Sequence, residues 1–196
     1  MAEIKFDSNA HIYYVDGKKT ISVTQALAVL SDFSNIRTDV LKRAGDFGTA
    51  CHLATALYDQ RVLDESVLDD NLKPHLSGWK LFLKDSGFAI EAIEKIVYSQ
   101  KYGYCGTIDR VGILNGRRAV IDIKTGQVSP TMAIQLSAYL TAYNEEMPYA
   151  EKAQDRMIVQ LKEDGTYSLP KKEFYKTTDF GVFKACLTIA KWKRAS

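Results

Sequence analysis

The chain has 196 residues, 46% of them hydrophobic and 26% charged, which is typical of a soluble globular protein with one well-filled core. The formal net charge of +2 excludes bulk charge as the attraction for a polyanion, so any nucleic-acid surface has to be local. The three cysteines are too widely spaced for a disulfide framework, and we find neither a secretion signal nor an apolar run of about 18 residues. We therefore expect a cytoplasmic protein that does not associate with a membrane.

The first half of the chain is predicted to be mainly helical after a short β-hairpin. Asp16-Gly17 separates two β-like runs, whereas the later apolar residues follow helical spacing. Gly45 and Gly48 weaken the longest helix, which we expect in one or two pieces. The expected elements are a hairpin within 11–23, a short helix over 26–30 capped by Ser22 or Thr24, a helix over 38–58, an acidic irregular linker over 59–70 and an amphipathic helix over 71–85.

The second half combines strands with two helices. Pro130 after Ser129 marks a helix start, and Asp164-Gly165 marks a turn between two short strands. The expected elements are a strand over 89–99, a hairpin within 104–126, a helix from 130 to 144, strands over 156–160 and 166–169, and a helix through 190 capped by Thr178 or Asp179. A hairpin followed by a crossover helix predicts an α/β fold with a mixed β-sheet flanked by helices.

The strongest local signal is Asn115-Gly116, which separates two apolar and β-branched runs and predicts a two-residue type I′ loop. Counting outward from that loop places Asp109 directly opposite Asp122. Two facing carboxylates repel each other, so the pair indicates a positive charge between them. Side-chain alternation puts Lys124 on the same face as Asp122. The hairpin therefore predicts a metal site with a lysine beside it.

Two structural alternatives explain the same residues without a metal. Asp109 could pair with Arg110 or Lys124 at a sheet edge, and Asp122 could cap a turn. A register slip of one residue would move Asp109 to the wrong face of the hairpin.

Other candidate residues lie outside the hairpin. Gln135 and Tyr139 are one helical turn apart and could hold a phosphate or a nucleobase, or could form a solvated helix edge. The small residues around His52 favour close approach of the backbone to another group, although a lone helical histidine is usually structural. Glu94, on the preceding strand, is either another acidic group near the site or a surface residue, and we favour the surface. Basic runs at 37–43, 117–118, 171–172 and 191–194, interleaved with aromatic residues, are a weak signal for nucleic-acid binding.

Four ordered motifs resemble those of the RecB-like branch of the PD-(D/E)XK nucleases. They are GTACH at 48–52, GTIDR at 106–110, IDIKTG at 121–126 and QLSAY at 135–139. The opening segment HIYYVDGKKTISVTQAL is also similar to that of phage-encoded members and of the mitochondrial genome maintenance exonuclease. The resemblance spans residues 11–145 and implies a restriction-endonuclease-like core.

The resemblance also implies a set of metal ligands. Asp109 and Asp122, with the backbone carbonyl of Ile123, would bind Mg²⁺ or Mn²⁺. His52 would be the additional ligand that marks this branch, and an imidazole shifts the preference toward Mn²⁺. Asp122 stands where many members have glutamate, a shorter reach that we expect the site to tolerate. The chain lacks the four-cysteine group of cluster-binding members, so we do not expect an iron–sulfur cluster.

The resemblance assigns roles in catalysis and substrate binding to three further side chains. Lys124 would orient the attacking water and stabilise charge on the phosphate. Gln135 and Tyr139 would position the Lys124 region or the nucleic-acid backbone. Phosphodiester hydrolysis needs a hydroxide at neutral pH and a counter-charge for the phosphate, and a carboxylate-bound metal supplies both.

We therefore predict a metal-dependent deoxyribonuclease, more specifically an exonuclease that acts on DNA ends or single strands in phage or prophage recombination or replication. One nuclease domain would span 1–196, with an N-terminal hairpin and helices over 1–88, a catalytic core over 89–145 and C-terminal strands and helix over 146–196. Partners would be DNA and a single-strand annealing protein or helicase in the bacterial cytoplasm. The alternatives are an RNA nuclease and a non-catalytic DNA-binding or protein-interaction module with the same fold.

Overall fold

A five-stranded mixed sheet forms the centre of the computed structural model, which describes residues 2–8, 10–30 and 37–195. The strands run in the spatial order β4-β5-β6-β7-β8, with β6 and β7 parallel and every other neighbouring pair antiparallel. Their bounds are Ala89–Ser99 for β4, Tyr104–Leu114 for β5, Arg117–Lys124 for β6, Asp155–Leu161 for β7 and Tyr167–Ser168 for β8. The predicted mixed α/β sheet is confirmed.

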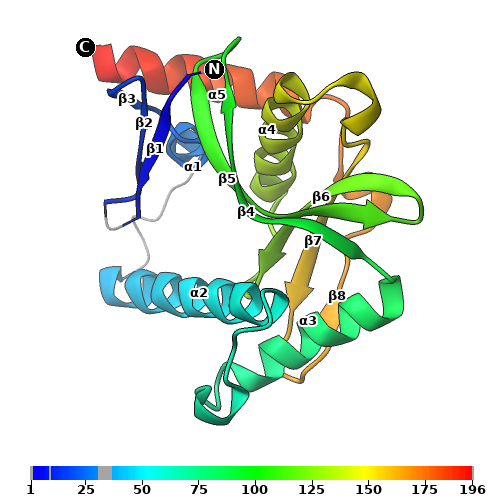
Figure 1. Ribbon diagram of the computed structural model, residues 1–196. Helices are drawn as coiled ribbons and strands as arrows, with labels where there is room; N and C mark the ends of the chain where they lie inside the picture. The colour runs from blue at the N-terminus through cyan, green and yellow to red at the C-terminus, as the bar shows by residue number, and fades with distance from the viewer. Residues whose placement is uncertain (1, 9, 31–36, 196) are drawn as a thin grey trace.

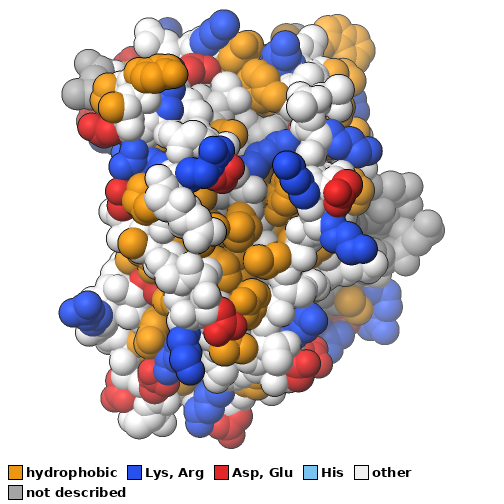
Figure 2. Space-filling view, turned by 90° about the vertical axis from the view of Figure 1, so that its right-hand side faces the viewer, with side chains coloured by type: hydrophobic (Ala, Val, Ile, Leu, Met, Phe, Trp, Pro, Cys, Tyr) orange, Lys and Arg blue, Asp and Glu red, His pale blue; other side chains and the backbone are white. Residues whose placement is uncertain are grey.

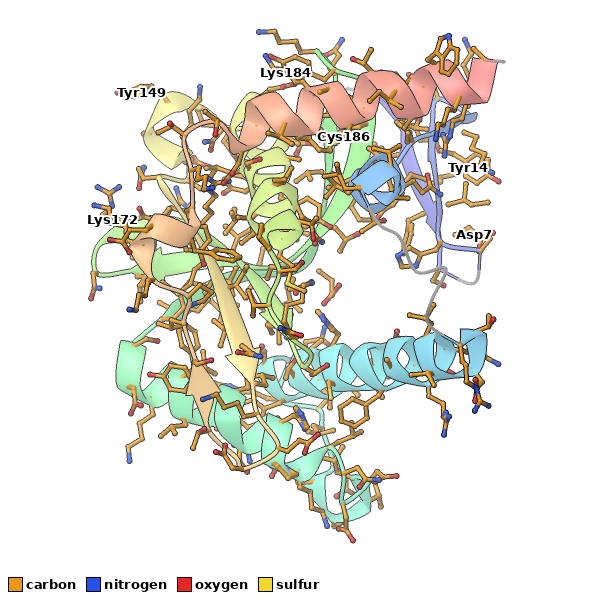
Figure 3. All side chains as sticks on the ribbon, turned by 180° about the vertical axis from the view of Figure 1, so that it is seen from behind. Asp7, Tyr14, Tyr149, Lys172, Lys184 and Cys186 are labelled. Atoms are coloured by element: carbon orange, nitrogen blue, oxygen red, sulfur yellow. The ribbon has the colours of Figure 1, made fainter. Side chains whose placement is uncertain are left out.

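Helices cover both faces of this sheet (Figure 1). On one face lie α1 (Val23–Leu27), α4 (Pro130–Glu146) and α5 (Asp179–Ala195), and on the other lie α2 (Thr38–Asp59) and α3 (Lys73–Ser86). Seen from behind, α5 lies across α4 and α1, and its own residue Cys186 is buried (Figure 3). Short 3-10 turns span Ala28–Leu30, Glu65–Val67, Tyr149–Glu151 and Lys172–Phe174.

The core is divided into two layers by the sheet. On the side of α4 and α5, Val120 and Ile158 pack with residues such as Leu136 and Phe183. On the side of α3, Ile121 and Ile123 pack against Trp79 and Phe82. Consecutive residues of β6 thus alternate between the two cores, which fixes the side of the sheet on which its polar residues lie.

A separate three-stranded antiparallel sheet precedes α1. It contains β1 (Ile4–Asp7), β2 (Ile12–Val15) and β3 (Lys18–Thr20) in that order. Asp16 and Gly17 both have positive φ, at 48° and 75°, as a type I′ turn requires. The predicted hairpin is confirmed, whereas β1 was not predicted. Tyr13 of β2 is joined to β5 by a 2.7 Å hydrogen bond between its hydroxyl and that of Thr107.

The central hairpin has the predicted register. Asn115 and Gly116 have φ of 50° and 74°, and the ladder runs from Leu114 opposite Arg117 to Arg110 opposite Ile121. Asp109 on β5 and Asp122 on β6 directly follow the last pair, one on each strand, and so stand opposite each other. The alternative register, slipped by one residue, is therefore excluded.

Several predicted element boundaries differ from the observed ones, and three of the differences have a clear consequence for the fold. Helix α1 begins at Val23 rather than at 26, because Ser22 and Gln25 form a reciprocal capping box. Helix α2 is continuous through both of its glycines and ends at Asp59, which we had placed in the linker. Helix α5 continues to Ala195.

None of the helices in the described part of the chain is long and apolar enough to cross a membrane. The division of 1–196 into three parts of one nuclease domain stays a prediction.

Candidate metal centre

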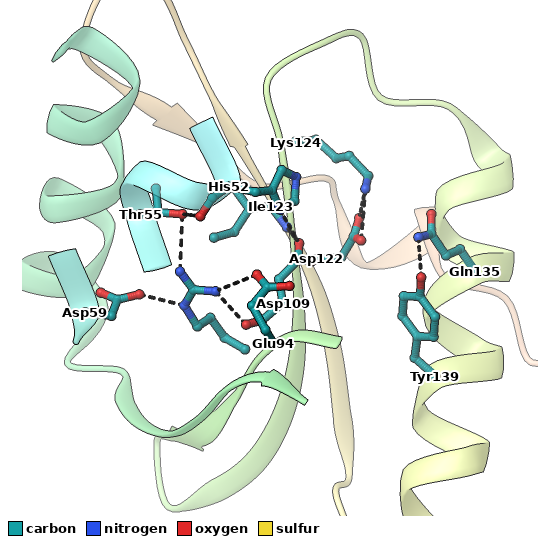
Figure 4. Close-up of polar contacts among 11 residues, drawn as sticks. His52, Thr55, Asp59, Glu94, Asp109, Asp122, Ile123, Lys124, Gln135 and Tyr139 are labelled. Atoms are coloured by element: carbon teal, nitrogen blue, oxygen red, sulfur yellow. Dashed lines mark hydrogen bonds and ion pairs between the residues drawn. The ribbon is translucent and has the colours of Figure 1, made fainter. Parts of the chain in front are cut away.

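The predicted site residues come from four elements and line one cleft of about 580 Å³. Helix α2 carries His52, β5 carries Asp109, β6 carries Asp122 and Lys124, and α4 carries Gln135 and Tyr139. Figure 4 shows these side chains between α2 and α4. The structure therefore brings together residues that are up to 87 positions apart in the sequence.

Three potential metal ligands form a compact group in this cleft. His52, Glu94 and Asp109 each have a ligand atom within 4.8 Å of those of the other two. The Nδ1 atom of His52 lies 3.3 Å from Oδ2 of Asp109. The same Asp109 oxygen accepts a hydrogen bond from the backbone N–H of Ile123 at 2.6 Å. Neutral imidazole and carboxylate oxygen are both good ligands for Mn²⁺, and carboxylate suits Mg²⁺.

Glu94 is the member of this group that sequence reasoning missed. We interpreted it as a surface residue, and its side chain is indeed 43% exposed, but it lies beside the site. Its positive φ of 49° interrupts β4 between the regular pairs Ile93–Arg110 and Lys95–Ile108. Glu94 therefore stands opposite Asp109 on the neighbouring strand. This neighbour depends on the register between β4 and β5, which the predicted strand 89–99 alone does not fix.

Asp122 is almost fully buried and is paired with Lys124. The Nζ atom of Lys124 lies 2.9 Å from Oδ1 and 2.8 Å from Oδ2 of Asp122. Only the contact to Oδ1 has hydrogen-bond geometry, so Oδ2 is a buried oxygen without a hydrogen-bond donor among the described residues. A buried carboxylate oxygen in this state is costly, and a cation would satisfy it. This oxygen is in ion-pair contact with Lys124 but accepts no hydrogen bond from the described residues, which fits a position beside a metal ion.

The charges of the site shift one another's pKa values. Burial and the neighbouring Asp109 raise the pKa of Asp122 to about 6, against the lowering effect of Lys124. Burial raises the pKa of Asp109, but His52, Lys124 and the Ile123 N–H outweigh it and hold that pKa well below its usual range. Burial and Asp109 raise the pKa of Glu94 to about 7. Negative charge is therefore crowded at this point, as a cation-binding site requires.

The pKa values of the two basic side chains respond to this negative charge. Asp109 raises the pKa of His52 against the opposing effect of burial. Burial lowers the pKa of Lys124, but Asp122 and Asp109 outweigh that effect and raise it. Lys124 is therefore a fixed ammonium at neutral pH, directed at the acidic group.

Gln135 and Tyr139 contact each other rather than forming a solvated helix edge. The Nε2 atom of Gln135 donates to the Tyr139 hydroxyl at 2.8 Å, and Tyr139 is only 5% exposed. The ring of Tyr139 packs against Gly106, where an added Cβ would lie 2.4 Å from a ring carbon. The glycine of the GTIDR segment is thus required by the close approach of α4 to β5. The alternative of a solvated helix edge is therefore excluded for Tyr139.

The basic runs give little support to a separate nucleic-acid surface. On the face shown in Figure 2, lysine and arginine side chains are dispersed among acidic and apolar ones. Several basic residues are also neutralised by acidic neighbours, as in the pairs Arg37–Asp39, Arg43–Asp39, Arg117–Asp155 and Arg118–Glu91.

A comparison with protein families identifies the domain. The family model described as the PD-(D/E)XK nuclease superfamily matches residues 76–185, which is more than half of the chain. The chain belongs to the PD-(D/E)XK nuclease superfamily. Members of this superfamily are usually metal-dependent nucleases, and the fold implies a DNA substrate. The matched segment contains Asp109, Asp122 and Lys124, but His52 lies outside it.

Other comparisons add less. No curated protein matches the chain. Among solved structures, a crystal structure of SSO0001 is similar over 88% of this chain and 75% of that chain, at 17% sequence identity and a TM-score of 0.42. This similarity is too low to support an argument about the fold or the site. For this PD-(D/E)XK domain, membership of the RecB-like branch stays a prediction.

Proposed function

We propose that this protein is a metal-dependent deoxyribonuclease whose active site is the cleft between α2 and α4. The observation that carries the proposal is the convergence of His52, Glu94 and Asp109 beside the buried pair of Asp122 and Lys124, in a chain of the PD-(D/E)XK nuclease superfamily. An acidic group next to an ammonium matches the needs of phosphodiester hydrolysis.

The metal would be Mg²⁺ or Mn²⁺, held by Asp109, Asp122, His52 and the backbone carbonyl of Ile123. Glu94 would be a further ligand, because it belongs to the same compact group as His52 and Asp109. When bound, the cation would supply Lewis acidity for water activation and a counter-charge for the phosphate. The histidine would favour Mn²⁺ over Mg²⁺ within this set.

The remaining residues would act directly on water or substrate. Lys124, which lies against the Asp122 carboxylate, would orient the attacking water and stabilise charge on the phosphate. Gln135 and Tyr139 would position the substrate backbone from α4. Their mutual hydrogen bond fixes the amide orientation and leaves its oxygen free to accept.

We further propose an exonuclease of the RecB-like branch that acts on DNA ends or single strands. The support is the resemblance of the four motifs and of the N-terminal segment to phage-encoded members of that branch. The same resemblance supports a role in phage or prophage recombination or replication, in the bacterial cytoplasm, together with a single-strand annealing protein or a helicase.

Cleavage of matched DNA substrates tests this proposal. End-labelled single-stranded and double-stranded linear DNA and a circular DNA of the same sequence would be incubated with Mg²⁺, Mn²⁺ or EDTA. We expect metal-dependent loss of linear DNA only. Cutting of the circle would make the protein an endonuclease, and binding without cleavage under either metal would instead favour the non-catalytic module. A matched RNA oligonucleotide separates a deoxyribonuclease from an RNA nuclease.

A further inference from the structure

Arg110 is a fully buried charged side chain that the proposed chemistry does not use. It follows Asp109 in β5, and its side chain is 0% exposed. The guanidinium lies over the ring of Trp79, 5.5 Å from its centre, on the side of the sheet that faces α3. A buried arginine is costly unless its donors are satisfied, so its partners are informative.

One acidic residue neutralises Arg110. The Nε atom of Arg110 donates to Oδ2 of Asp59 at 2.6 Å, and the Asp59 side chain is 1% exposed. Trp79 Nε1 holds the same carboxylate at 2.9 Å from Oδ1 and 3.1 Å from Oδ2. Asp59 is the last residue of α2, the helix that carries His52. This ion pair therefore fixes the end of α2 against β5.

The remaining donors of Arg110 lead to the candidate metal ligands. Nη1 donates to the backbone carbonyl of Asp109 at 2.6 Å and lies 3.4 Å from Oε1 of Glu94. Nη2 donates to the Thr55 hydroxyl at 3.2 Å, and that hydroxyl donates to the backbone carbonyl of His52 at 2.9 Å. The segments that carry His52, Glu94 and Asp109 are thus each one or two hydrogen bonds from the same guanidinium.

We propose that Arg110 is a positioning residue, because its single planar guanidinium sets the relative placement of three of the four ligand-bearing segments, namely those of His52, Glu94 and Asp109. This inference rests on the proposed function, in which those segments bind a divalent cation. Lysine keeps the charge but has no rigid fork of donors, so it cannot reach the three segments together. The competing interpretation is an ion pair that only stabilises the packing of α2 on β5.

The sharpest test removes one link of this network and keeps the ion pair between Arg110 and Asp59. In Thr55→Val the volume is similar and the Arg110–Asp59 pair stays intact, but the hydroxyl between Arg110 and His52 is lost. Thr141→Val is the matched control, because Thr141 makes the same kind of bond within α4, to the carbonyl of Ser137 at 2.8 Å. The probe is Mn²⁺ alone, with the free ion measured by its electron paramagnetic resonance signal.

We expect Thr55→Val to raise the dissociation constant for Mn²⁺ about tenfold, as losses of groups that orient metal ligands do. Arg110→Lys is expected to raise it at least as much, and Thr141→Val to leave it within about twofold. In a His52→Ala background the effect of Thr55→Val should disappear, because coupled residues are not additive. The inference is supported if Thr55→Val weakens Mn²⁺ binding in the parent protein but leaves the binding of the His52→Ala variant unchanged.

The results that would contradict the role of Arg110 can be told apart from those that would contradict the proposed metal site. If His52→Ala weakens Mn²⁺ binding but Thr55→Val does not, Arg110 is only a structural ion pair and the proposed function stands. An equal loss from Thr55→Val with and without His52 would also overturn the positioning role. If the parent protein binds no Mn²⁺, the proposed metal site falls and the inference falls with it. If His52→Ala binds Mn²⁺ unchanged, His52 is not a ligand, so the link from Arg110 through Thr55 ends at no ligand and the inference alone falls.

Discussion

The side chains of the site are held in a state that is unfavourable without a cation. Asp122 is 1% exposed, lies near a second carboxylate and keeps one oxygen without a hydrogen-bond donor among the described residues. Lys124 supplies the nearest positive charge. Stability is given up locally for a site that binds positive charge, as is common where side chains serve function.

The pH dependence of stability without metal should report this cost. Asp122 has a pKa of about 6 in the folded protein against an ordinary value of 3.8, so its neutral form favours folding. Its contribution is complete below about pH 4 and is lost as the pH rises through 6. In EDTA, the free energy of unfolding of Asp122→Asn minus that of the parent should rise between pH 4 and 7, on the order of 1–3 kcal/mol. A difference that is independent of pH in urea titrations would contradict the burial of an ionisable Asp122.

The position of Glu94 makes a separate prediction about metal affinity. Glu94→Gln removes a charged oxygen from the group with His52 and Asp109, so Mn²⁺ should bind at least about tenfold more weakly. Isothermal titration calorimetry measures this directly. Glu91→Gln is the matched control from the same strand, because Glu91 pairs with Arg118 away from the site. Equal affinity of the two variants for Mn²⁺ would show that Glu94 is a surface residue and not a metal ligand.

For individual side chains, the sequence predicted the positions of those site residues whose placement depends on local periodicity. Strand alternation and the two-residue loop are enough to bring Asp122 and Lys124 together and to direct Asp109 toward them. Glu94 could not be placed in the same way, because a positive φ interrupts its strand. The partnership of Asp59 with Arg110 depends on how a helix docks on the sheet, and neither residue's sequence neighbours indicate it.

Among the elements, the contact between β5 and α4 does most to define the cleft. Gly106 lets the ring of Tyr139 lie directly on β5, which positions α4 beside the carboxylates. The helix is held there by further contacts, such as the hydrogen bond from the Tyr104 hydroxyl to the carbonyl of Ala138 at 2.8 Å. A change in this spacing should therefore affect both stability and the site.

Gly106→Ala should destabilise the protein on the order of 1–3 kcal/mol, because the new methyl group would overlap a buried ring. Gly45→Ala provides the opposite control. An added Cβ at Gly45 meets nothing within 4 Å, and alanine favours an exposed helical position by about 1 kcal/mol. Urea unfolding of both variants measures the difference. Equal stabilities would show that α4 is not in contact with β5 at this point.

Most elements were predictable because their apolar residues follow a clear period. Helix α3 has its stripe at Leu76 and Trp79, and it ends at Gly87 in the left-handed conformation expected of a C-cap. Strand β1 was missed, since Ile4–Asp7 is short and pairs with a hairpin that already looked complete. The continuity of α2 was uncertain because helix propensity alone cannot show that Cys51 and its small neighbours are packed.

In the whole molecule, the cleft combines parts from both sides of the sheet. Helices α2 and α4 cover opposite faces of the sheet (Figure 1), yet residues of both line the cleft that contains Asp109 and Asp122. The family match begins at residue 76, so α2 and the N-terminal sheet lie outside it although they line the same cleft. The arrangement of these distant segments could not be predicted from local patterns, because it depends on packing between elements far apart in sequence.

The central claim is that cleavage depends on a metal held by the carboxylates of the β5–β6 hairpin. The most direct test compares the parent protein with Asp122→Asn on labelled linear DNA in Mg²⁺, Mn²⁺ and EDTA, after thermal unfolding has shown that both are folded. We predict metal-dependent cleavage by the parent and only the EDTA level of cleavage by Asp122→Asn under every metal. Equal cleavage by the two proteins would contradict the assignment of this site.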